Sequence, residues 1–104
     1  MTHDELLKLP ARRLRALIGA RRLSPVELMD ACISRIEAIN PAVNAIAATD
    51  FERARASAVH AERQVMRGGP LPPLHGLPLG VKDLQDTEGL LSTSGNIALR
   101  NHVP

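Results

Sequence analysis

Phe51 is the only aromatic residue in this chain of 104 residues, which contains no Trp and no Tyr. Because aromatic side chains bury the largest apolar areas, a core here has to be built from aliphatic side chains and alanine. A folded chain of this size buries only about 60–70% of the surface that it exposes when unfolded. We therefore expect one small domain with a small aliphatic core.

The net charge is modest, at +2, but the arginines are unevenly distributed. Five of them lie close together, namely Arg12, Arg13, Arg15, Arg21 and Arg22. Such a cluster can contact nucleic-acid phosphates, although modules that bind single strands also use aromatic stacking, for which this region has no side chain. We expect a solvated helix face here, and we keep a small nucleic-acid-binding helical module as the weaker hypothesis.

Other features bear on compartment and cofactors. A single cysteine, Cys32, cannot form an internal disulfide, and no apolar run approaches the roughly 20 residues of a membrane helix. The N-terminus is acidic, unlike a signal peptide, so we expect a cytoplasmic protein without membrane contact. We expect no metal and no other cofactor, because the four histidines are far apart: His3, His60, His75 and His102.

Helix-start signals dominate the first 40 residues. Thr2 and Glu5 have the spacing of a capping box, which predicts a short helix over residues 3–9. In residues 10–22 the apolar side chains recur on one face, which predicts an amphipathic helix. Ser24 and Pro25, with Glu27 closing a second capping box, predict a helix over residues 25–40 that ends at Asn40-Pro41.

The second half predicts a β-α-β unit. Residues 42–48 and 77–82 are apolar enough for strands, and residues 51–67 are rich in helix formers, with Thr49 and Glu52 as a capping box. We therefore predict an α/β fold, with a helical region at 2–40 and the start of an α/β core at 42–104. Two strands leave open edges, so the predicted sheet is incomplete.

Lys82 follows the second predicted strand and precedes a run of hydroxyls, Ser92, Thr93 and Ser94. Burial would lower the pKa of such an amine and allow it to act as a base toward a serine. The alternative is an ordinary surface lysine that remains protonated and pairs with Asp83 or Asp86. Composition and spacing leave both interpretations open.

The segment "GLPLGVKDLQDTEGLLSTSG", residues 76–95, resembles the lysine-bearing motif of the amidase signature family, hydrolases of carbon–nitrogen amide bonds. The match runs through Gly80-Val81-Lys82-Asp83 and Asp86-Thr87 to the hydroxyl pair before Gly95. Residues 24–48, "SPVELMDACISRIEAINPAVNAIAA", resemble the N-terminal region of the family more weakly. The chain departs from the pattern at Ser92, which replaces a threonine, and at Asn96, which replaces a serine.

The resemblance implies that Lys82 is the basic member of a Ser, cis-Ser, Lys triad, within an α/β/α sandwich around a mixed sheet. The two catalytic serines of the family belong to a Gly/Ser-rich segment, and none of these 104 residues matches it. We therefore interpret residues 1–104 as the N-terminal part of a single amidase domain, inactive alone, which needs the remainder of that domain to act on a small-molecule amide. The nearest alternative within the family is the amidotransferase subunit that transfers ammonia onto misacylated tRNA, because it shares the lysine motif.

Overall fold

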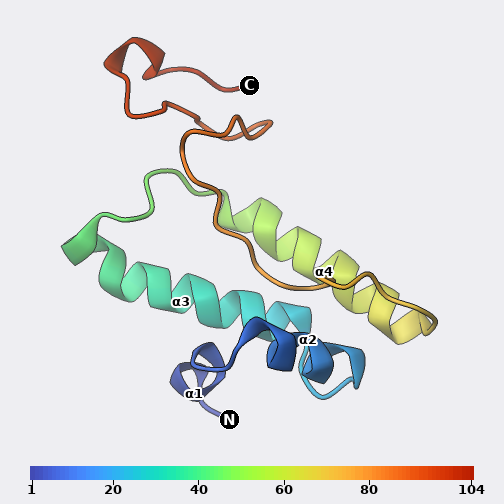
Figure 1. Cartoon of the computed structure of the whole chain (residues 1–104). Helices are drawn as coiled ribbons and strands as arrows, with labels where there is room; N and C mark the ends of the chain where they lie inside the picture. The colour runs from blue at the N-terminus through green and yellow to red at the C-terminus, as the bar shows by residue number, and fades with distance from the viewer.

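The computed structural model describes all 104 residues and is helical. Its elements are α1 (His3–Leu7), α2 (Ala11–Gly19), α3 (Pro25–Val43), α4 (Phe51–Arg67) and the short 3-10 helix η1 (Ile97–Leu99). The two long helices α3 and α4 run antiparallel and pack against each other, while α1 and α2 lie against the beginning of α3 (Figure 1). No helix in the structure is both long enough and apolar enough to cross a membrane.

The core lies at one end of this helical arrangement. Ile18 of α2 and Leu28 of α3 are almost completely buried, and Val65 of α4 packs against the same cluster. The full cluster is aliphatic, as the composition predicts: Leu6, Leu14, Leu17, Ile18, Leu23, Leu28, Ala31 and Val65. Cys32, expected in the core, is half-buried beside this cluster, and burial raises the pKa of its thiol.

Side-chain caps explain where the helices begin. Thr2 and Glu5 form the predicted capping box of α1. Ser24 caps α3 by accepting a hydrogen bond from the Val26 amide, as predicted, but Glu27 does not complete a box. The prediction for α4 was wrong by one residue, since Asp50 and not Thr49 is its cap, with its carboxylate accepting from the Arg53 amide at 3.1 Å.

Residues 71–77 connect the end of α4 to the second half of the chain and are held on the core. Arg15 donates to the carbonyl oxygens of Leu71 and Pro72, and a ring nitrogen of His75 lies 2.9 Å from the Ala61 carbonyl oxygen of α4. Gly76 has a φ of +79°, and a Cβ on it would lie 3.0 Å from a side-chain carbon of Pro25. The contact therefore requires glycine.

This anchoring determines the path of the following residues. The chain runs back along α4 toward the loop between α3 and α4, and residues 83–104 lie at the end of the molecule opposite to α1 and α2 (Figure 1). Apolar side chains are exposed at this end, among them Leu79, Leu84 and Ile97.

The predicted β-α-β unit and its mixed sheet are wrong, because the structure contains no strand. A strand exists only when another strand pairs with its backbone groups, and residues 42–48 and 77–82 form no ladder with each other. In the first of these segments, the amide and carbonyl groups of Ile46 instead bond to the side chain of Asn40, at 2.9 and 3.0 Å. One asparagine side chain thus takes the place of a strand partner.

The predicted end of α3 at Asn40-Pro41 is also wrong, since the helix continues through Pro41 to Val43. Proline removes one amide donor from a helix, and so close to the C-terminus little helix remains to be disrupted. Asn44 then ends the helix in the left-handed conformation, with a φ of 50° and its amide bonded to the Asn40 carbonyl oxygen. The helix therefore covers part of the segment predicted as a strand.

Candidate active site

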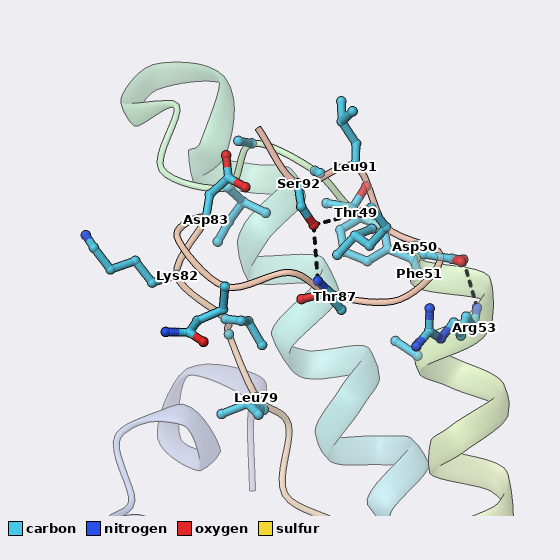
Figure 2. A pocket seen from close by; sticks show the side chains of 18 of the residues that line it. Thr49, Asp50, Phe51, Arg53, Leu79, Lys82, Asp83, Thr87, Leu91 and Ser92 are labelled. Carbon is cyan, nitrogen blue, oxygen red and sulfur yellow. Dashed lines mark hydrogen bonds between the residues drawn. The ribbon is translucent and has the colours of Figure 1, made fainter. Parts of the chain in front are cut away.

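A groove of about 540 Å³ lies at the end of the molecule opposite to the core (Figure 2). One side is formed by Ile36 of α3, the loop over residues 45–50 and the first turns of α4, including Phe51 and Arg53. Residues 79–83 and the turn that carries Ser92 form the other side. The groove therefore joins the Lys82 segment to the two long helices.

Lys82 lies on the rim of this groove and is exposed. Its side chain points away from the other side chains of the lining (Figure 2). The ammonium group makes no hydrogen bond and no ion pair with any residue of the chain, and the burial expected for it is not present in these 104 residues.

Asp83, the next residue, is held by the hydroxyl turn. Its carboxylate accepts two hydrogen bonds from Thr93, one from the amide at 2.9 Å and one from the hydroxyl at 2.6 Å. These bonds favour the ionised form, so Thr93 lowers the pKa of the Asp83 carboxyl. The Asp83 carboxylate is therefore engaged ten residues further along the chain and not with its neighbour Lys82.

Asp86 also has another partner, because its carboxylate lies 3.2 Å from a ring nitrogen of His102. The sequence alternative, in which Lys82 pairs with Asp83 or Asp86, is thus wrong with respect to the pairing and right with respect to the surface position of the lysine.

The three hydroxyls near Lys82 are not arranged around its amine. Ser92 is buried, donating its hydroxyl to the Leu90 carbonyl oxygen and accepting from the Thr87 amide. The Thr93 hydroxyl is bonded to Asp83, and Ser94 is exposed. At the two departures from the family pattern, local hydrogen bonding is complete, since Asn96 accepts from the Ala98 amide as the cap of η1.

Arg53 was not singled out from the sequence, yet it connects α4 to the Lys82 segment. Its guanidinium donates to the Glu88 carbonyl oxygen at 2.6 Å, and a Cβ on Gly89 would lie only 3.1 Å from the same group. Two backbone bonds close the segment from within: the Gly89 amide donates to the Pro104 carbonyl oxygen, and the Ser92 amide donates to that of His102. The glycine after Glu88 was the available signal, because it allows this close approach.

The remaining candidates from the sequence do not form a second site. Four of the clustered arginines are exposed, whereas Arg15 holds the 71–77 loop. No three His, Cys, Asp or Glu side chains come together anywhere in the structure.

These features define a helical segment that presents an unpaired lysine beside a groove and a hydrogen-bonded hydroxyl turn. The model of the Amidase family matches residues 27–104, which include all of these parts. The chain therefore belongs to the Amidase family, and the resemblance of the lysine motif is confirmed.

Individual relatives agree with this membership. The chain is 39% identical to an acylamidase of Rhodococcus erythropolis over 99% of its own length and 23% of that protein. It is 36% identical to a glutamyl-tRNA(Gln) amidotransferase subunit of Streptomyces coelicolor, over 97% of its own length and 20% of the relative. The chain thus spans about a fifth of the length of the curated relatives that it matches.

Proposed function

We propose that this chain is the part of an amide-cleaving enzyme that supplies the basic lysine, Lys82. In the proposed reaction, the Lys82 amine accepts the proton of a serine hydroxyl, and a serine oxygen then attacks the amide carbonyl carbon. The carbon–nitrogen bond breaks, the leaving amine takes up a proton, and an acyl-serine ester remains. Water hydrolyses that ester and releases the acid.

The observation that carries this proposal is the family match over the whole segment from Lys82 to Gly95. The unpaired state of Lys82 agrees with it, because a base must be able to lose its proton, and an ion-pair partner would favour the protonated form. The serines of the triad, and with them the remainder of the amidase domain, are partners that the proposal requires. Their packing over the exposed lysine would provide the desolvation that these 104 residues alone do not.

A chimeric enzyme tests the role of Lys82. This chain replaces the aligned stretch of the Rhodococcus erythropolis acylamidase, and hydrolysis of a chromogenic anilide is measured. We expect Lys82→Met to lower kcat/KM by about 10²–10⁴-fold or more, because a positioned base contributes roughly this factor. Lys8→Met is the matched control, since Lys8 is the only other lysine and lies at the end of α1, far from the groove in sequence and in space.

Either of two results would overturn the proposal. One is a folded chimera in which Lys82→Met hydrolyses the anilide as fast as the unsubstituted chimera. The other is equal loss of activity in the Lys8→Met and Lys82→Met chimeras, which would show a general effect of removing a lysine.

The second candidate function is that of an amidotransferase subunit, favoured by relatives named glutamyl-tRNA(Gln) amidotransferase, such as the one from Roseiflexus, 42% identical over 79% of the chain. Both candidates share cleavage of an amide carbon–nitrogen bond, with the difference that the transferase passes the released ammonia to an acceptor. Hydrolysis of simple amides by the chimera without other protein chains would favour the amidase. We further propose a small-molecule amide as substrate and the cytoplasm as location, the latter from the single free cysteine.

A further inference from the structure

Two carboxylates lie close to Lys82 in the sequence, and the structure shows both of them bound elsewhere. Asp83 accepts both the amide and the hydroxyl of Thr93, and Asp86 lies beside His102. The Thr93 contact is the stronger of the two, because a carboxylate held by two short bonds from one residue has little freedom to turn toward another group. Thr93 also belongs to the segment that is closed by the backbone bonds of Gly89 and Ser92.

We propose that Thr93 is a positioning residue that holds the Asp83 carboxylate and thereby keeps it from forming an ion pair with the Lys82 ammonium. The inference rests on the proposed role of Lys82 as a base. It assigns a function to the hydroxyl turn, whose side chains otherwise have no part in the reaction.

The physical reason is a competition for one carboxylate. An anion beside an ammonium group stabilises the charged form, and a base has to be neutral to accept a proton. Thr93 offers Asp83 two donors at 2.9 and 2.6 Å, which satisfy the carboxylate without using the lysine. The lowered pKa of the Asp83 carboxyl agrees with this assignment, since its largest cause is the Thr93 side chain.

Other charged groups near the groove have defined positions as well. Arg53 is bonded to the Glu88 carbonyl oxygen, and the Asp50 carboxylate caps α4. From α3 only Ile36, an apolar residue, contributes to the lining, and the loop over residues 45–49 contributes no charge. Asp83 and Asp86 are therefore the acidic groups best placed in sequence to pair with Lys82.

The test measures how strongly Asp83 acts on Lys82 with and without Thr93. The chain contains two lysines, so NMR of the side-chain amines resolves each titration separately. The titration of Lys82 is recorded in four proteins: the native chain, Asp83→Asn, Thr93→Val and the double variant. We expect Asp83→Asn to lower the Lys82 midpoint more in the Thr93→Val background than in the native one, by roughly 0.1–0.7 pH unit, the range that corresponds to an exposed ion pair.

Matched variants separate the hydroxyl from a general effect on the segment. Thr93→Ser keeps the hydroxyl and should behave as the native chain. Thr87→Val removes a threonine hydroxyl of the same segment that makes no hydrogen bond, and it should leave the Lys82 titration unchanged. Equal effects of Asp83→Asn in both backgrounds would overturn the proposal. So would a large effect of Asp83→Asn in the native chain, which needs no Thr93 variant and thus no assumption about its folding.

The chimeric acylamidase distinguishes failure of this inference from failure of the proposed function. If Lys82→Met is inactive, we expect Thr93→Val to shift the acidic limb of the kcat/KM profile to higher pH and Thr93→Ser to restore it. An unchanged profile in Thr93→Val would refute the positioning role while Lys82 remains the base. Full activity of Lys82→Met would instead refute the proposed function itself.

Discussion

Ser24→Ala is expected to destabilise the chain because one hydroxyl serves both long helices. Ser24 caps α3 by accepting from the Val26 amide at 3.0 Å, and it donates to the Glu62 carboxylate of α4 at 2.5 Å. The hydroxyl thus satisfies an otherwise unpaired amide and links the two helices that frame the groove. Both side chains are half-buried.

The magnitude follows from the two bonds. Replacement of a serine cap by alanine costs about 0.5–2 kcal/mol of stability. A hydrogen bond to a charged group contributes about 1.5–3 kcal/mol, and we take the lower part of this range because water reaches both side chains. Ser24→Ala should therefore lower the free energy of unfolding by roughly 2–3 kcal/mol in total.

Urea unfolding followed by circular dichroism at 222 nm measures this loss. Ser34→Ala is the matched control, since Ser34 is exposed in the middle of α3 and should change the free energy by less than about 0.5 kcal/mol. A double-mutant cycle with Glu62→Ala separates the two contributions, and its coupling energy gives the bond between the helices.

The reasoning would be refuted by a coupling energy near zero, because the contact between Ser24 and Glu62 would then contribute nothing. It would also be refuted if Ser24→Ala cost no more than Ser34→Ala, since neither the cap nor the bond would then stabilise the fold.

Three further predictions concern the core, the loop and the hydroxyl turn. Leu28→Ala should cost about 2–5 kcal/mol in the same urea assay, because the side chain is 1% exposed and leaves a cavity; a loss below about 1 kcal/mol would contradict its place in the core. Gly76→Ala should destabilise more than Gly69→Ala, because both have positive φ but only at Gly76 would a Cβ meet core atoms; equal losses would exclude a steric cause. Acidification should release Thr93 from Asp83, since a lowered pKa means that the unfolded carboxyl binds protons first: the stabilisation is present above the ordinary carboxyl pKa and is lost as pH falls through the lowered one. The Thr93 amide resonance should report this transition in NMR, and its persistence in Asp83→Asn would contradict the assignment.

The helices could be predicted from the sequence because their signals are local. Thr2 with Glu5, and Ser24 with Pro25, each act within one helical turn, so the starts of α1 and α3 follow from neighbouring residues. The apolar face of Leu14, Leu17 and Ile18 likewise predicted which side of α2 is buried.

The strands could not be predicted in the same way. An apolar run such as residues 42–48 is compatible with a strand, but a strand requires a partner, and no local signal says whether one is present. Here Asn40 bonds to Ile46 and α3 extends to Val43, so the segment has a different structure.

The candidate site was predicted in part. The motif identified Lys82 and the family, but it did not reveal that Asp83 binds Thr93 or that Arg53 holds the Glu88 carbonyl oxygen. These contacts join residues 10 and 35 positions apart, and their geometry depends on how the whole segment folds back.

The sequence by itself determined the family, the position of the lysine, and the starts of the helices, because each of these depends on residue identity over a few positions. Only the tertiary structure decided that the sheet is absent, that the core lies at one end and the groove at the other, and that both neighbouring carboxylates turn away from Lys82. These properties depend on contacts between distant residues, whose free energies compete with one another, and short-range patterns do not record the outcome of that competition.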